Sequence, residues 1–295
     1  MSSAGTDANT SEPTSLYGYT PSRVATIILL VLFAITFVLH GMAYLRYRLK
    51  FLLMTLVFCP NLEILGWGAR LWSTFKPNVE FPHKVQSATL AMGATPLLAA
   101  NFFIFQLVIA HLGQSYSRLS PKAYTIVFGG LSLLGFLLLL GGTGMASAKK
   151  EGDIVDLGRN VTMGGMIYHI VISVLFGVYA LEYLVRFRRR QPVGPFVRVQ
   201  SSSQDALHGH MSKTVKIVLN AIVADVMILI VRFGYRTLEL AQGADGSLAK
   251  KEIWLILLDA AQVLIASAIW NIVHPCRMLG IEREEPKDVE MSASL

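Results

Sequence analysis

Charge and cysteine are both scarce in this chain of 295 residues. Charged residues make up 15% of the sequence and hydrophobic residues 53%, and the mean hydropathy is +0.52. A soluble globular domain carries about 25% charged residues, so the composition excludes an ordinary soluble domain. The two cysteines, Cys59 and Cys276, are too few for a disulfide framework.

The sequence also lacks the short motifs of several enzyme classes. It contains no G-x-x-x-x-G-K-[ST] phosphate loop, which excludes ATP hydrolysis by that route, and no G-x-S-x-G or H-E-x-x-H. A seven-helix zinc hydrolase remains a minor alternative, because His40, His111, His169, Asp225 and His274 all lie in apolar segments. No two of these histidines share a helix, and we expect neither an enzyme nor a metal or other cofactor.

Seven long apolar segments account for most of the chain. A membrane-spanning helix needs about 20 apolar residues, and irregular backbone cannot face lipid. The predicted fold is therefore all-α, a seven-helix transmembrane bundle over 22–280, between polar tails at 1–21 and 281–295 that we expect to be disordered. The predicted spans are 24–45, 51–73, 87–112, 123–145, 162–185, 215–237 and 253–274.

The distribution of Lys and Arg predicts the orientation of the bundle. Alternate connections are strongly basic, above all 186–216, and the positive-inside rule makes that side cytoplasmic. The N-terminus is then outside and the C-terminus inside, with the first span as its own membrane anchor. Asn9 is a predicted glycosylation site in the outer tail, and Arg186–Arg190 is expected to contact anionic inner-leaflet headgroups. The net charge of +7 reflects this asymmetry rather than nucleic-acid binding.

Several charged and polar residues lie inside the apolar segments. Each charge at the centre of a membrane costs roughly 2.5–3.5 kcal/mol on translocon scales, so such residues face a bundle interior, pair, or line a route. Glu63, Trp67 and Arg70 share one face of the second span because their spacings are four and three residues. The candidates for a substrate-binding or coupling site are Glu63, Arg70, Asn101, His169, Asp225, Arg232, Arg236, Glu239, Asp259 and Gln262.

Two interpretations of these residues stay open from the sequence. Three acids and two arginines at comparable depth in spans two, six and seven could form a purely structural ion-pair network. They could also line a polar cavity that recognises an amphipathic cation or zwitterion. The two interpretations are compatible with each other.

The ordered polar motifs resemble those of the fungal lipid-translocating exporter family, the RTA-like seven-helix membrane proteins. The resemblance runs from Tyr19-Thr20-Pro21-Ser22 to His274-Pro275, nearly the whole chain. Four motifs carry it. The second span contributes Leu62–Arg70, and the third contributes Gln86 with Ala94-Thr95-Pro96. The end of the sixth span contributes Arg232 with Tyr235–Glu239, and the last loop and helix contribute Gly243, Gly246, Glu252, Asp259 and His274-Pro275. The chain departs from the family pattern in the uncharged fourth span, at His169 and at Cys276.

The resemblance implies a multi-pass protein of the plasma membrane or an internal membrane that moves amphipathic lipids such as sphingoid bases and protects against toxic amphiphiles. Membrane lipids and an amphipathic lipid substrate are the implied partners. The hypothesis is ATP-independent translocation or export, with a seven-helix lipid sensor as the alternative because the fold alone does not decide function.

Overall fold

A computed structural model describes residues 17, 19–148, 152–193, 211–243 and 246–281. The predicted tails, including Asn9, fall largely outside these residues. The described chain is helical throughout, and seven of its helical segments are long and apolar enough to cross a membrane. These are Arg23–Tyr47, Lys50–Phe75, Glu80–Leu112, Pro121–Ala146, Asp153–Arg189, Lys213–Gln242 and Glu252–Met278.

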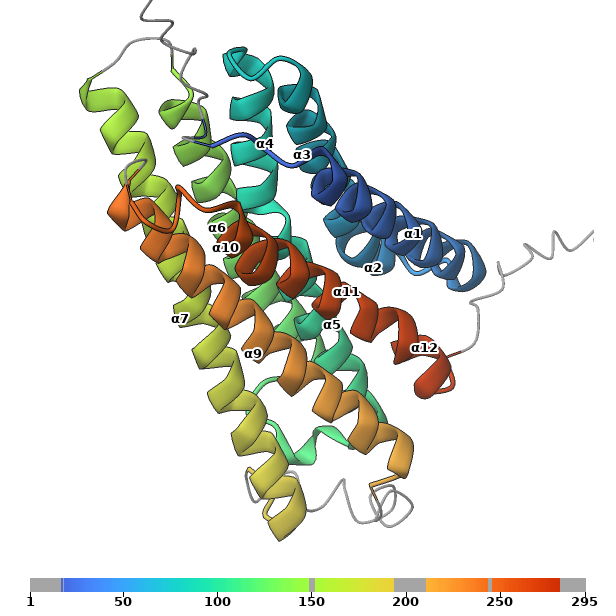
Figure 1. The fold of residues 1–295 in the computed structure, drawn as a ribbon. Coiled ribbons are helices and arrows are strands. Elements are labelled where there is room, and N and C mark those ends of the chain that lie inside the picture. Colours follow the sequence, from blue (N-terminus) through green and yellow to red (C-terminus); the bar gives the residue numbers. More distant parts are fainter. Residues whose placement is uncertain (1–16, 18, 149–151, 194–210, 244–245, 282–295) are drawn as a thin grey trace, which may run out of the picture.

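Four of the spans are single continuous helices (Figure 1). They are α1 (Arg23–Tyr47), α6 (Pro121–Ala146), α7 (Asp153–Arg189) and α9 (Lys213–Gln242). Three of the four begin behind a serine N-cap whose side chain accepts from a backbone amide three residues on. These caps are Ser22, Ser120 and Ser212.

The remaining three spans are interrupted. The second comprises α2 (Lys50–Leu52), a π-helical turn (Leu53–Val57) and α3 (Phe58–Phe75). The third comprises α4 (Glu80–Met92) and α5 (Ala94–Leu112), which meet at Gly93. The seventh comprises α10 (Glu252–Leu255), a π-helical turn (Ile256–Ala260) and α11 (Ala261–Ile272), followed by the short α12 (Pro275–Met278).

Prolines explain two of these three interruptions. A proline inside a helix lacks the N–H that would bond to the carbonyl four residues earlier. Pro60 follows the π-helical turn of the second span, and Pro96 follows the break at Gly93 in the third. No proline lies in the π-helical turn of the seventh span, so its sequence carries no such signal.

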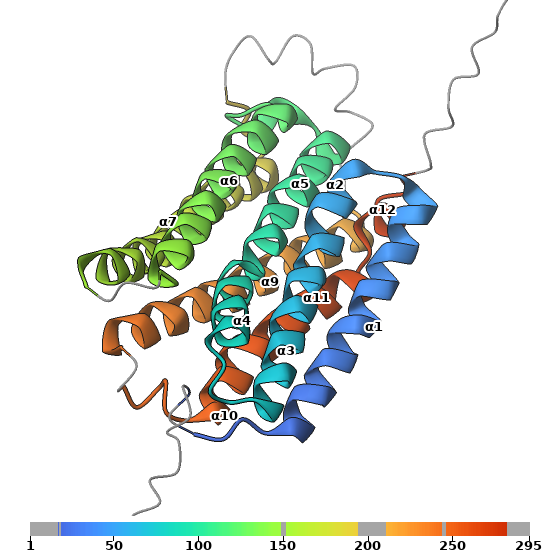
Figure 2. The same ribbon diagram turned by 90° about the horizontal axis from the view of Figure 1, so that it is seen from above.

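The third span is the centre of the bundle. Within its apolar window 78% of the residues are buried, against 28% in the first and fourth spans. Figure 2 shows α5 between α6 on one side and α2 and α3 on the other, with α9 and α11 behind it. The outer helices expose large apolar side chains such as Ile35, Leu137 and Val178, as expected of a surface that contacts lipid.

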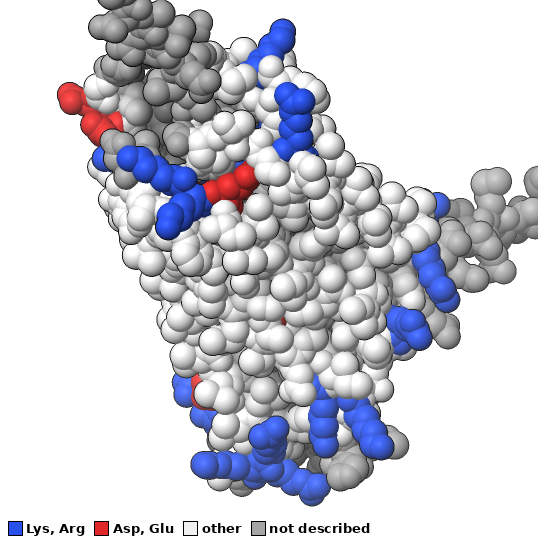
Figure 3. Space-filling view, in the orientation of Figure 1, with Lys and Arg blue, Asp and Glu red and all other residues white. Residues whose placement is uncertain are grey.

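Charged side chains gather at the two ends of the molecule. Figure 3 shows a broad band without surface charge between them, consistent with a membrane-embedded zone. The spans alternate in direction, so one end holds the starts of α1 and α10 and the other holds the start of α2 and the end of α7. We call these the N-terminal face and the C-terminal face.

Candidate functional site

Two arginines and an aspartate form the most buried ion-pair cluster, on the last two spans. Arg232 Nε of α9 donates to Asp259 Oδ1 at 2.7 Å, and Arg236 Nη2 donates to Asp259 Oδ2 at 2.6 Å. The Arg232 side chain is 0% exposed and that of Asp259 is 1% exposed. Asp259 therefore uses both carboxylate oxygens in charge-assisted hydrogen bonds, which suits a carboxylate removed from water.

Arg236 extends this cluster toward the N-terminal face. Its Nη1 donates to Glu239 Oε2 at 2.8 Å, one turn further along α9. The side chain of Arg236 is 12% exposed and that of Glu239 is 18% exposed, so the exposure of the cluster increases toward the end of the bundle. The sequence placed Arg236 and Glu239 on one face, and the structure joins them to Asp259 of the neighbouring span.

The break in the third span supplies further acceptors to Arg232. Its guanidinium donates to the backbone carbonyl of Leu90 and, from Nη1 at 3.4 Å, to that of Ala91. Both carbonyls belong to the last turn of α4, just before Gly93. A broken membrane helix leaves carbonyls in need of donors, and a buried cation meets that need. Arg232 is thus held by two spans at once.

Glu63 of α3 lies beside this cluster without an ion pair of its own. Its Oε2 accepts from Trp67 Nε1 at 3.3 Å, while its Oε1 has no hydrogen-bond partner among the described residues. The residue is 0% exposed and lies within electrostatic reach of Asp259, Arg232 and Arg236. The cluster therefore contains three acids (Glu63, Glu239 and Asp259) but only two arginines (Arg232 and Arg236) among the described residues.

Gly93 makes the room that Glu63 occupies. A methyl group built at this glycine would overlap the Glu63 carboxyl group, so the carboxylate lies directly against the backbone where the third span breaks. Glycine is required here because of this close approach rather than because of a special backbone conformation: the φ of Gly93 is −54°. The Gly93–Glu63 contact joins the second and third spans at the depth of the ion-pair cluster.

A second cluster closes the N-terminal face. Arg70 Nη2 donates to Glu252 Oε1 at 2.7 Å and to the Tyr19 hydroxyl at 2.9 Å. The backbone N–H of Ser22 also donates to the Glu252 carboxylate, and the Arg70 guanidinium lies over the Tyr17 ring, 5.1 Å from its centroid. The segment that precedes α1 therefore lies across the end of the second and seventh spans.

Tyr19 takes part in this closure as a neutral phenol. Burial raises the pKa of Tyr19, although Arg70 beside it favours the phenolate. Its oxygen therefore carries a proton at neutral pH and still accepts from Arg70 through a lone pair.

A third polar group lies deeper, between α5 and α9. Asn101 Nδ2 donates to Asp225 Oδ2 at 2.5 Å and to the carbonyl of Leu97 in its own helix at 3.0 Å. Asn101 and Asp225 are both 0% exposed. This pair contains no cation, unlike the other two clusters.

The remaining predicted residues, His169 and Gln262, make their hydrogen bonds to backbone carbonyls of their own spans. The His169 Nδ1 lies 2.8 Å from the Gly165 carbonyl and its ring stacks on Phe233, with centroids 4.9 Å apart. Gln262 donates to the Leu257 carbonyl of its own span, away from the clusters. Gly93 and the carbonyls before it were not among the predicted site residues, although a glycine three residues before Pro96 was a usable signal.

The zinc-hydrolase alternative requires at least three ligands close together. Within the described ranges, no three side chains of His, Cys, Asp or Glu come together as a metal site. His40 instead pairs with the Ser267 hydroxyl at 3.1 Å, and His274 stacks on Tyr47.

These features define a polytopic α-helical membrane protein with a charged interior. Residues 56–282 match the family model described as RTA1 like protein. The chain belongs to the RTA1-like family, as its motifs predicted.

Curated fungal relatives are similar at low identity. The chain is 24% identical to the lipid-translocating exporter-like protein RTA1 of Leptosphaeria maculans, over 88% of this chain and 51% of that protein. It is 24% identical to the sphingoid long-chain base transporter RSB1 of Saccharomyces cerevisiae, over 88% of this chain and 74% of that protein. Protein RTA1 of the same yeast is 21% identical over 94% of this chain and 90% of its own length. The chain thus spans about half of the Leptosphaeria relative, and no solved structure matches it.

Proposed function

We propose that this protein moves amphipathic lipids with a cationic headgroup, of the sphingoid-base class, across the membrane without hydrolysing ATP, and that it acts as a transporter rather than an enzyme. The family and the printed names of its relatives support a role in lipid transport. The apolar exterior and charged interior support a substrate that has both a hydrocarbon chain and a charged end.

The observation that carries the proposal is the free oxygen of Glu63. A buried carboxylate oxygen without a donor costs about 1–3 kcal/mol or more. Glu63 Oε1 has no such donor among the described residues, whereas Asp259 has a donor on each oxygen. A protonated amine would donate to Glu63 Oε1 and supply the positive charge that the cluster of three acids and two arginines lacks.

The neighbouring groups favour a ligand at Glu63 rather than at Asp259. Arg232 is fixed by Asp259 and by two backbone carbonyls, so it cannot turn to Glu63 without breaking those bonds. Trp67 occupies only one oxygen of Glu63 and holds the side chain in place. The amine of a long-chain base is small enough to approach a carboxylate while its hydrocarbon chain stays in an apolar environment.

The test is movement of a fluorescent sphingoid base between the leaflets of liposomes that contain the purified chain. We expect Glu63→Gln to lose most of the transport rate while it keeps the acceptor for Trp67 and the fold. Glu182→Gln is the matched control, because Glu182 pairs with Arg118 and Arg186 at the C-terminal face. A normal rate in Glu63→Gln would refute the assignment, and binding without movement by the intact chain would favour the sensor.

We further propose that the C-terminal face is cytoplasmic and that the protein resides in the plasma membrane. The run Arg186–Arg190 at the end of α7 supports contact with anionic headgroups of the inner leaflet. Export toward the N-terminal face would then begin on this basic side.

A further inference from the structure

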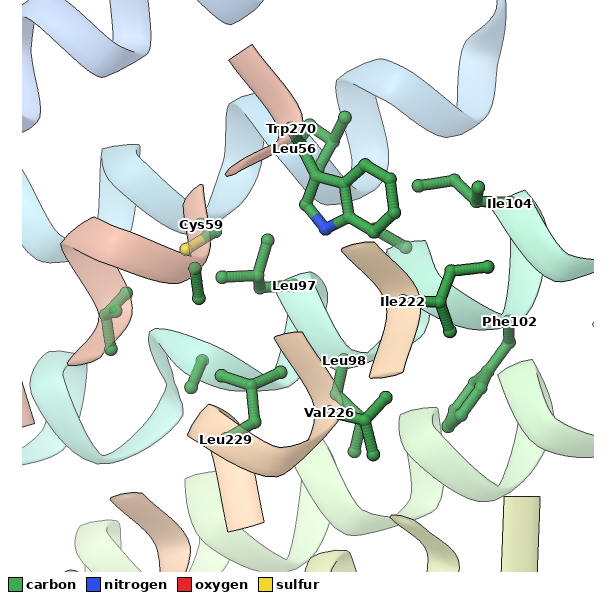
Figure 4. Close-up of a cluster of buried hydrophobic side chains, with 14 of the residues drawn as sticks. Leu56, Cys59, Leu97, Leu98, Phe102, Ile104, Ile222, Val226, Leu229 and Trp270 are labelled. Atoms are coloured by element: carbon green, nitrogen blue, oxygen red, sulfur yellow. The ribbon is translucent and has the colours of Figure 1, made fainter. Parts of the chain in front are cut away.

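Asp225 lies in apolar surroundings, roughly two helical turns along α9 from Arg232. Figure 4 shows the buried side chains around this part of α9, which come from α3, α5, α9 and α11. They include Cys59, Leu97, Leu98, Ile222, Val226, Leu229 and Trp270. A carboxyl group in such a place is costly to keep ionised unless it is paired.

The hydrogen bonds around Asp225 are incomplete in a specific way. Asn101 occupies Asp225 Oδ2, and its amide orientation is fixed because the same Nδ2 also donates to Leu97. Asp225 Oδ1 is buried and makes no hydrogen bond of normal geometry among the described residues; the Trp270 indole, whose Nε1 is also without such a bond, is the donor that faces the Asp225 side chain. The pair thus accommodates a carboxyl group that carries a proton on Oδ1, with the Asn101 bond to Oδ2 unchanged.

The groups that face Asp225 from the neighbouring elements do not neutralise it. From α3 the Cys59 thiol lies within electrostatic reach of Glu63, Arg232 and Asp225. From α5 Asp225 meets the neutral amide of Asn101, and from α11 the N–H of the neutral Trp270 indole, a second hydrogen-bond donor. On α7 the titratable group that faces α9 is His169, which stacks on Phe233, about two turns away from Asp225. At the start of α9, α12 brings the buried thiol of Cys276 and Arg277.

Among the acids of the described membrane interior, Glu63 and Asp225 are those without an ion pair. Asp259, Glu239 and Glu252 each pair with an arginine. The arginines of the interior are therefore committed to other acids, and Asp225 can become neutral only by taking up a proton or a small cation. Beside it the only polar side chains among the described residues are Asn101 and Trp270, and one amide oxygen falls short of the several oxygen ligands that a metal cation needs, which leaves the proton.

We propose that Asp225, held by Asn101, is a proton-binding site that couples proton movement to the lipid movement proposed above. This inference rests on the proposed function: Glu63 receives the amine and Asp225 receives the proton. Cys59 lies one turn from Glu63 on α3 and within electrostatic reach of Asp225, so the two carboxyl groups sit on one connected part of the interior.

Proton binding is tested first without any substrate, by infrared difference spectroscopy of the reconstituted chain during a pH titration. A protonated carboxyl group in apolar surroundings gives a carbonyl band separate from that of carboxylates. We expect Asp225→Asn to lose one titrating band that the intact chain and the exposed-acid control Asp153→Asn both keep. An unchanged spectrum in Asp225→Asn would overturn the proposal.

Coupling is tested in liposomes with an imposed pH gradient and a clamped membrane potential. We expect the gradient to accelerate sphingoid-base movement by the intact chain severalfold, and Asp225→Asn to move lipid at one rate with or without the gradient. If Asp225→Asn does not fold, Asp225→Glu retains a carboxyl group and should keep both the titrating band and the response to the gradient.

The failures of the two proposals are distinguishable. An intact chain that moves no lipid contradicts the proposed function, while the infrared titration still decides whether Asp225 binds a proton. If the intact chain moves lipid at the same rate with and without the pH gradient, the coupling is contradicted, but the assignment of Glu63 is not.

Discussion

Arg232 shows how a charge can be kept inside a membrane protein at a fixed place. It donates to a carboxylate on one neighbouring span and to two carbonyls on another, all of them buried. Removing one partner of a buried charge pair costs about 3–5 kcal/mol, because it leaves an uncompensated charge. Arg232 therefore fixes the third and seventh spans against α9, while Glu63 beside it keeps one oxygen free.

The contact between Gly93 and Glu63 yields a prediction at this scale. In Gly93→Ala the new methyl group would overlap the Glu63 carboxyl group, which must leave its position. We expect the variant to lose sphingoid-base transport and to be destabilised by about 1–3 kcal/mol, the usual range for overpacking. Thermal unfolding in detergent and the liposome assay measure both effects.

The control for this change is Gly68→Ala on α3, where a methyl group would have no neighbour within 4 Å. It should unfold and transport like the intact chain. Equal transport by the two variants would show that the space at Gly93 is not needed for Glu63 to act.

The residues of the site were only partly predictable from the sequence. Helical spacing predicts that Glu63 and Trp67 share a face, and the structure joins them by a hydrogen bond. The same spacing cannot predict that Arg70 turns to Glu252, because that pairing depends on how the second and seventh spans pack. Nor can it predict that Asp225 is left without an arginine, since charge composition does not fix which acid lies nearest to which base.

At the scale of helices, all three interrupted spans reach the charged interior, where they meet the two arginines of the continuous α9. The second contributes Glu63, the third its carbonyls before Gly93, and the seventh Asp259 within its π-helical turn. Such turns shift side chains relative to a regular helix and are frequent at functional sites. Pro60 and Pro96 mark two of the interruptions in the sequence, whereas Asp259 lies in a turn with no proline to signal it.

Helix ends were less predictable than helix existence. The third and fifth spans begin at Glu80 and Asp153, well before the predicted starts at 87 and 162. A hydropathy pattern marks only the apolar part of a helix, and both helices continue through polar turns beyond it. The all-helical, seven-span prediction itself is confirmed.

The packing of α6 against α7 gives a prediction for a pair of elements. At Gly158 the α7 backbone approaches the α6 backbone at Gly142 and Ala146 so closely that a methyl group would overlap it. Because backbone atoms cannot move aside as a side chain does, we expect Gly158→Ala to separate the two helices locally. A loss of about 1–3 kcal/mol should follow.

Thermal unfolding of the purified chain measures this loss. Gly164→Ala on the same helix is the matched control, since its methyl group would have no neighbour within 4 Å. Equal unfolding of the two variants would contradict a close helix contact at Gly158.

At the scale of the whole molecule, the orientation in the membrane is the property open to direct measurement. Both native cysteines are buried, so replacing them by alanine leaves a background for single exposed thiols. We expect a membrane-impermeant maleimide added to intact cells to label Lys251→Cys at the N-terminal face and not Lys122→Cys at the C-terminal face. Both positions are exposed. The reverse labelling would place the N-terminus in the cytoplasm.

The pairing of Arg70 with Glu252 has a consequence for how the protein is made. The two residues are 182 positions apart, so the second span enters the membrane long before its counter-ion has been synthesised. Arg232 likewise precedes Asp259 by 27 positions. The charge balance of the interior is therefore completed only when the seventh span has been synthesised, and a chain that ends before α10 holds Arg70, Arg232 and Arg236 without these two acids.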